Sequence, residues 1–266
     1  MLFFFTMKPL LKSVLLIITF GFITTKFADA QLKTKLTLGG SYYSGNVDKS
    51  DIISTGNTAW NDSLYEFSAF YKIAYGTTNG EEINREFSGG VKFDYKPQST
   101  LSPFLMLKAY NNIYKGYDLR LSVLAGVKYA FYRGANGSYS ISGAFIYDRE
   151  SYTPNTETGI KNPDMNLLRL SIRPKFSQKI GKSMTLEHTT FFMYKVYSSP
   201  EEVVPVPKPE NYNNDWIIES STTLSNKLSK KMSLQLSYDI NYTGKPPSSN
   251  IKNTDKVFVV SLVLDI

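Results

Sequence analysis

The sequence predicts an all-β protein, a twelve-stranded antiparallel transmembrane β-barrel that follows a cleaved signal peptide. Three observations support this fold class. Apolar and polar side chains alternate along extended segments, and turn signals separate an even number of these segments. After residue 30, no apolar run approaches the ~18 consecutive residues that would indicate a transmembrane helix.

The first thirty residues have the pattern of a secretory signal peptide. Lys8 and Lys12 precede an apolar run at residues 14–23, and residues 28–30 (ADA) follow as a small-x-small cleavage site. We therefore expect a signal peptide over residues 1–30 and a barrel over residues 31–266. A retained membrane anchor is the alternative, but the apolar run has about half of the ~20 residues that a spanning helix needs.

The alternation has period two. In segment 118–132, every odd position from Leu119 to Phe131 is apolar, whereas the even positions are mostly small or charged. Segments 64–75 and 232–243 alternate in the same way. Strands of a soluble periplasmic sandwich also alternate, but they average about 5–6 residues. The longer segments here match the ~9–11 residues of a tilted membrane-spanning strand.

Turn signals define twelve expected strands, and single-chain outer-membrane barrels have even strand numbers. We expect these strands at residues 32–44, 49–60, 64–75, 82–95, 101–114, 118–132, 138–150, 165–180, 184–198, 215–228, 232–243 and 255–266. Short connections alternate with a set that contains the long ones, at 151–164, 199–214 and 244–254. Short periplasmic turns and longer extracellular loops are typical of such barrels, so both termini are expected on the periplasmic side.

Aromatic residues and the last strand point to the outer membrane of a Gram-negative bacterium. Aromatic side chains lie near both ends of the expected strands and predict two interfacial girdles, although aromatics are also good strand formers: Trp60, Tyr65, Tyr129, Phe131, Tyr139, Tyr147, Tyr194 and Trp216. From Phe258 to Leu264, every second residue is apolar and in phase with Ile266. Such a final strand resembles the signal that the barrel-assembly machinery recognises, with Ile in place of the usual terminal Phe.

The composition excludes several kinds of site. The chain has no Cys and one His, which excludes disulfide scaffolds, thiolate zinc sites, iron–sulfur clusters and multi-histidine metal sites. We expect no cofactor and no metal. The formal net charge of +7 is not concentrated in a dense Lys/Arg stripe, so no nucleic-acid partner is expected. The expected partners are outer-membrane lipid and lipopolysaccharide, and the barrel is expected to be a monomer.

Four segments, in order, resemble a known family. They are residues 39–46 (GGSYYSGN), 84–88 (NREFS), 101–103 (LSP) and 116–126 (GYDLRLSVLAG). Over residues 35–150 the chain is similar to an uncharacterised family of salt-induced outer-membrane proteins, a β-barrel domain of unknown function. The resemblance implies an outer-membrane barrel. It implies no activity and assigns no functional residue.

If the apolar faces meet lipid, the opposite faces place charged side chains in the lumen. The expected basic wall comes from segments 118–132 and 165–180, and the expected acidic wall from segments 64–75 and 82–95, with two further acids beyond them. The candidates are Arg120, Lys128, Arg169, Arg173, Lys175 and Lys179, and Glu66, Glu82, Glu86, Asp94, Glu187 and Glu219. Opposed walls of this kind select ions in a water-filled constriction. The alternative is that these charges pair and plug the lumen, and the strand number does not decide between the two.

Two weaker candidates lie outside the lumen. His188 shares the lipid-facing side of its strand with Thr190, a conceivable base–nucleophile pair, although a neutral interfacial histidine is the simpler interpretation. Four acids near the loop at 151–164 could collect a divalent cation, but without a calcium-loop spacing: Asp148, Glu150, Glu157 and Asp164. The loop at 199–214 contains four prolines and is expected to be extended, either as a lid over the barrel mouth or as a plain surface loop.

These observations predict a non-enzymatic outer-membrane barrel with an envelope-structural or stress-related role. One alternative is a narrow passive pore for ions or small solutes. A second alternative is a lipid-active enzyme centred on His188.

Overall fold

The computed structural model describes residues 31–43, 49–154, 163–199, 216–245 and 253–266. All of these except Gln31 belong to one compact unit, Leu32–Ile266. The expected signal peptide and nearly all of the proline-rich loop at 199–214 lie outside the described residues. Among the described helices, none has the length and apolar character needed to cross a membrane.

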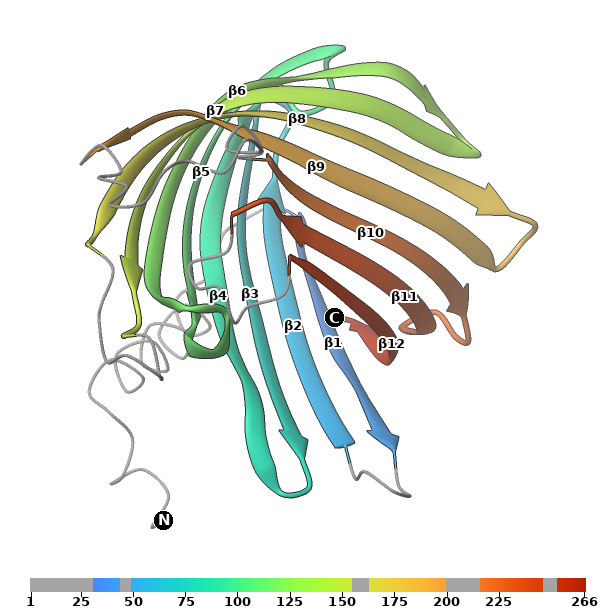
Figure 1. Ribbon diagram of the computed structural model, residues 1–266. Coiled ribbons are helices and arrows are strands. Elements are labelled where there is room, and N and C mark those ends of the chain that lie inside the picture. The colour runs from blue at the N-terminus through green and yellow to red at the C-terminus, as the bar shows by residue number, and fades with distance from the viewer. Residues whose placement is uncertain (1–30, 44–48, 155–162, 200–215, 246–252) are drawn as a thin grey trace, which may run out of the picture. The chain divides into compact units, whose positions relative to one another are not determined.

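The described chain forms a closed β-barrel of twelve strands, in which neighbours in sequence are neighbours in the sheet (Figure 1). The strands are β1 (Gln31–Tyr43), β2 (Lys49–Asn61), β3 (Tyr65–Thr78), β4 (Glu81–Tyr95), β5 (Leu101–Asn112), β6 (Tyr117–Gly134), β7 (Gly137–Tyr152), β8 (Met165–Ile180), β9 (Met184–Ser199), β10 (Trp216–Lys227), β11 (Met232–Thr243) and β12 (Thr254–Asp265). Strand β12 closes the barrel by pairing antiparallel with β1, with Leu264 opposite Leu36. The predicted fold class is confirmed, and each strand end lies within three residues of its expected position.

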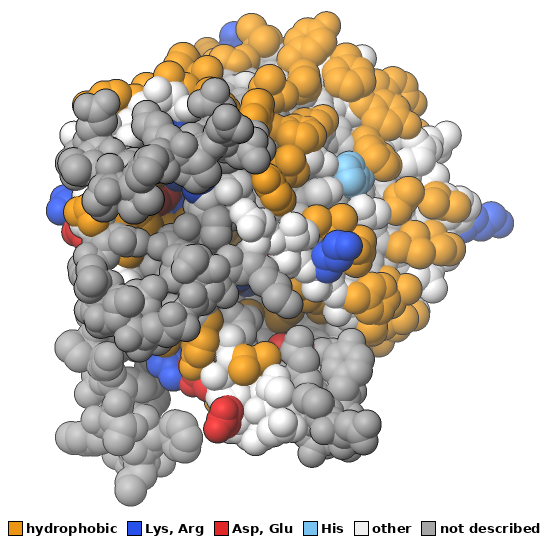
Figure 2. Space-filling view, viewed as in Figure 1, with side chains coloured by type: hydrophobic (Ala, Val, Ile, Leu, Met, Phe, Trp, Pro, Cys, Tyr) orange, Lys and Arg blue, Asp and Glu red, His pale blue; other side chains and the backbone are white. Residues whose placement is uncertain are grey.

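Period-two alternation separates a lipid face from a lumen face. On β12, Phe258, Val260, Leu262 and Leu264 are exposed, whereas Val259 and Val263 between them are buried. The same alternation leaves most outward positions apolar, and hydrophobic side chains cover much of the visible described surface in Figure 2. A closed barrel with an apolar outer surface leaves no unpaired strand edge in lipid, which is the architecture of outer-membrane proteins.

Aromatic pairs lie near the strand ends, as two girdles require. Tyr65, near the β2–β3 turn, packs against Tyr95 with ring centroids 5.8 Å apart. At the opposite ends of the strands, Tyr194 and Trp216 pack with centroids 4.9 Å apart. Both pairs join neighbouring strands and point outward, where amphipathic rings meet the lipid headgroups.

The β3–β4 hairpin is longer than the sequence analysis expected. Its loop is only Asn79-Gly80, with φ angles of 52° and 82°, which is the positive-φ pair of a two-residue hairpin turn. The register shifts between Gly76 and Thr77, so that Asn84 pairs with Gly76 and Glu82 with Thr77. Glu82 therefore leaves the lumen side and pairs with outward-facing Arg85. The expectation that Glu82 lines the lumen is wrong, because a bulge inverts the alternation there.

Candidate functional site in the barrel lumen

The middle of the lumen contains an apolar cluster. Its members come from five strands and pack against two phenylalanines: Met106, Leu124, Ile146, Met193 and Ile217, with Phe70 and Phe191 beside them. Gly90 of β4 makes room for one of these rings, because a Cβ built there would lie 2.7 Å from Cζ of Phe70. The lumen is therefore partly filled by side chains, as in small barrels.

A buried ion-pair network lies along the inner wall formed by β6, β7 and β8. Arg169 donates hydrogen bonds to Asp148 and to Glu150, the latter at 2.9 Å. Nε of Arg120 lies 2.8 Å from Oε1 of Glu150, an ion pair without the alignment of a hydrogen bond. Tyr152 donates to the other oxygen of Glu150 at 2.5 Å. Each charged side chain of this network is thus paired with an opposite charge on a neighbouring strand.

Asp148 and Glu150, expected in a loop cation site, are lumen residues. Both lie in β7 and are buried, in phase with Ile146. The alternation along residues 142–150 is the signal that could have found them. Of the other two acids of that expected site, Glu157 lies outside the described residues, and Asp164 precedes β8. Among the described side chains, no group of three or more His, Cys, Asp or Glu is arranged to hold a metal ion.

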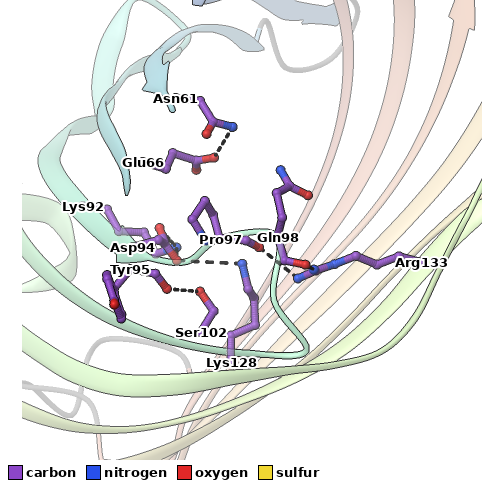
Figure 3. Close-up of polar contacts among 10 residues, drawn as sticks. All are labelled: Asn61, Glu66, Lys92, Asp94, Tyr95, Pro97, Gln98, Ser102, Lys128 and Arg133. Atoms are coloured by element: carbon purple, nitrogen blue, oxygen red, sulfur yellow. Dashed lines mark hydrogen bonds and ion pairs between the residues drawn. The ribbon is translucent and has the colours of Figure 1, made fainter. Parts of the chain in front are cut away.

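The acids of β3 and β4 also have partners close by. Glu86 pairs with Lys72 at 2.8 Å. Asp94 is fully buried and pairs with Lys92 at 2.5 Å, while Lys128 of β6 reaches it at 3.9 Å (Figure 3). Glu86 and Asp94 thus lie in the lumen, but each pairs with a lysine of the same two strands, which is the alternative of paired lumen charges for these two acids.

Glu66 of β3 lies near the charged side chains of Asp94 and Lys128. It accepts a hydrogen bond from Asn61 at 3.3 Å (Figure 3). At the β6 end, Arg133 donates to the carbonyl oxygens of Pro97 and Gln98. The Arg133 contacts join the end of β6 to the β4–β5 turn, whereas the Asn61–Glu66 bond spans the β2–β3 turn.

The remaining lumen charges have no ion pair with any residue that the structure describes. Arg173 of β8 stacks on Phe191, with the guanidinium carbon 4.9 Å from the ring centroid. Glu187 of β9 and Glu219 of β10 face the lumen, as does Asp239 of β11, whose Oδ1 is buried without a hydrogen-bond partner. These unpaired acidic side chains of the lumen therefore lie on other strands than the β3 and β4 that were expected. They are on β9, β10 and β11.

A cavity of about 260 Å³ opens in the lumen beside the apolar cluster. It is lined by charged side chains of both signs, together with tyrosines and small polar residues. The charged ones are Lys72, Lys108, Lys115 and Arg120, and Glu86, Glu219 and Asp255. This cavity is the candidate functional site, because several charged side chains of the lumen point into a space that can hold water or a small solute.

His188 lies on the lipid face, within a chain of hydrogen bonds. Its Nδ1 is 2.8 Å from Oγ1 of Thr222, and its Nε2 is 2.9 Å from Oγ1 of Thr190. Thr190 is in turn 3.2 Å from Oγ of Ser220. A hydroxyl, and not a carboxylate, occupies the place of the group that orients a catalytic histidine. The chain satisfies polar side chains that would otherwise be unpaired in lipid.

Solved structures with a similar fold include outer-membrane channels. A NanC porin structure superposes with a TM-score of 0.50 at 11% identity, covering 89% of this chain and 100% of the porin. An outer-membrane channel from Pseudomonas putida F1 superposes with a TM-score of 0.56 at 8% identity, covering 91% of this chain and 100% of the channel. At these identities the similarity supports the fold alone. A comparison with curated proteins gives no match.

A family model matches residues 36–200 and 208–266, which together span most of the chain. The match agrees with the resemblance of the four sequence segments to a β-barrel domain family of unknown function. The chain is an outer-membrane β-barrel and belongs to the family described as Protein of unknown function, DUF481.

Proposed function

We propose that this barrel is a narrow passive pore for small polar solutes and ions. The observation that carries the proposal is the charged cavity of about 260 Å³ inside the lumen. Seven charged side chains line this internal space, and a polar lining of this kind suits the passage of water, ions and small polar solutes. The NanC porin and the Pseudomonas putida channel add support, since barrels of this kind include pores.

The route past the apolar cluster follows the side of the lumen where side chains are small. Ser221, Thr223 and Ser225 of β10 face inward beside Ser237 and Gln235 of β11. Thr223 and Ser237 are hydrogen-bonded at 3.0 Å, as are Gln235 and Ser225. Short hydroxyl side chains leave space and provide donors and acceptors for water, whereas the methionines and leucine of β5, β6 and β9 do not.

A matched pair of substitutions on β11 tests this route. Ser237 faces the lumen opposite Thr223, and its neighbour Leu236 is exposed on the lipid face. Planar-bilayer recordings of Ser237→Trp should show unit conductance reduced at least several-fold, while Leu236→Trp conducts like the unsubstituted protein. Each variant is first shown to be folded by its heat-dependent shift on a gel. Equal conductance in the two variants contradicts the route, and no conductance from the folded, unsubstituted barrel favours the envelope-structural role.

A further inference from the structure

We propose that the lumen cavity binds a small zwitterion, a solute with one carboxylate and one ammonium group, such as an amino acid. The inference deepens the proposed function, since it names the class of solute that the pore would recognise. It rests on which charges in the cavity remain without a partner.

Most charges that line the cavity are already paired. Lys72 pairs with Glu86 at 2.8 Å, and Lys115 pairs with Asp255 at 2.9 Å. Arg120 pairs with Glu150, which lies in the wall behind the cavity lining. Lys108 and Glu219 are the two charged lining residues that form no ion pair with any residue in the described part of the chain.

Lys108 and Glu219 reach the cavity from different parts of the barrel. Lys108 lies on β5, with Nζ 5.9 Å from the ring centroid of Tyr110. Glu219 lies on β10, paired in the sheet with Phe191 of β9 and Asn241 of β11. Its carboxylate is close enough to interact electrostatically with Tyr110 and Arg120, which line the cavity on the β5–β6 side. A solute in the cavity therefore meets a cation of β5 and an anion of β10, neither of which forms an ion pair with a described residue. Longer-range interactions link Lys108 to Glu86 and Glu219 to Lys72.

A zwitterion matches this arrangement better than a simple ion does. A half-buried charge without a partner is unfavourable, and a solute with both charges compensates Lys108 and Glu219 together. An anion or a cation alone compensates only one of them. Asn241, Thr243 and Asn253 also line the cavity and offer neutral hydrogen-bonding groups to the rest of the solute.

Titration calorimetry on the full-length protein, purified folded in detergent, tests the site. The probes are β-alanine and 4-aminobutyrate, with acetate and methylammonium as single-charge controls. The zwitterions should bind at least tenfold more tightly than either control. Lys108→Met and Glu219→Gln should each weaken zwitterion binding at least tenfold. Glu187→Gln is the matched control, because Glu187 faces the lumen without an ion pair but does not line the cavity.

A charge exchange separates recognition from mere structural damage. In the double variant Lys108→Glu/Glu219→Lys the cavity again has one free charge of each sign, so zwitterion binding should recover relative to either single-charge variant Lys108→Glu or Glu219→Lys. Zwitterions that bind no better than acetate and methylammonium would overturn the inference, as would wild-type affinity in both Lys108→Met and Glu219→Gln.

The outcomes distinguish this inference from the proposed pore. Conductance without preferential zwitterion binding supports the pore and overturns the inference. Zwitterion binding by a folded barrel that does not conduct supports the binding site and contradicts the pore.

Discussion

Arg120 and Glu150 form an ion pair within the wall of the barrel, on the neighbouring strands β6 and β7. Nε of Arg120 and Oε1 of Glu150 are 2.8 Å apart, and their side chains are 14% and 2% exposed. Glu150 also accepts a hydrogen bond from Arg169. Glu150 therefore interacts with two guanidinium groups, of which Arg169 has Asp148 as a second partner.

Glu150→Gln should destabilise the barrel strongly. The substitution removes the carboxylate that pairs with Arg120, whereas Arg169 keeps its ion pair with Asp148, and breaking a buried pair in this way costs about 3–5 kcal/mol. The free energy of unfolding, measured by urea titration in lipid vesicles, should fall by an amount of this order. Glu82→Gln is the control, because its partner Arg85 is exposed and such pairs contribute less than about 1 kcal/mol. If the free energy of unfolding fell equally in the two variants, the buried ion pairs would stabilise the barrel no more than an exposed pair does.

Gly90→Ala should destabilise the barrel by about 1–3 kcal/mol, the usual cost of overpacking. The new methyl group would meet the Leu107 carbonyl oxygen and the Phe70 ring. Gly143→Ala serves as the comparison, since a Cβ there meets nothing within 4 Å. Urea titration of both variants should show a loss for Gly90→Ala alone. A neutral Gly90→Ala would mean that the Phe70 ring can move away freely.

Arg173→Gln should shift the ion selectivity of the pore towards cations. Arg173 has no ion pair among the described residues, so its charge is available to passing ions while the acids of β9–β11 remain. The reversal potential in a salt gradient measures this shift. Arg149→Gln removes a charge of the same kind from the outer face of β7 and should leave the reversal potential unchanged. An unchanged reversal potential in Arg173→Gln would place Arg173 away from the conduction path.

His188→Ala separates the pore from the lipid-active enzyme. We expect no phospholipid hydrolysis by the purified protein, and conductance that is the same in His188→Ala, because the histidine lies on the lipid face. The free energy of unfolding should fall modestly, since Thr222 and Thr190 each lose a hydrogen-bond partner. Hydrolysis by the wild-type protein that disappears in His188→Ala would instead support the enzyme.

The sequence predicted the faces of the strands well because lipid imposes the alternation on them. Leu262 and Leu264 meet lipid while Val263 between them is buried, and the strand ends lie close to their expected positions. The Asn79-Gly80 pair is a common two-residue hairpin signal, and it marks the true position of the β3–β4 turn. Apolar–polar alternation places Glu82 on the lumen face, and this is wrong because alternation does not reveal a β-bulge.

Contacts within the lumen could not be predicted in the same way. Alternation indicates that Arg120 and Glu150 point inward but not which inward residues pair, because pairing depends on the register between strands. The apolar cluster has the same cause: Met106, Leu124 and Ile146 are inward apolar residues, and only the register of β5, β6 and β7 brings them level. The same register determines which charges, such as Lys108 and Glu219, are left without a partner.

The central claim is that the lumen conducts. The most direct test is single-channel recording of the full-length protein, purified folded from membranes and inserted into a planar lipid bilayer. The account predicts reproducible unit steps of small conductance, with a reversal potential that depends on the unpaired lumen charges. A preparation shown to be folded and inserted that gives no steps would contradict the account and assign the lumen charges to stabilising a closed barrel.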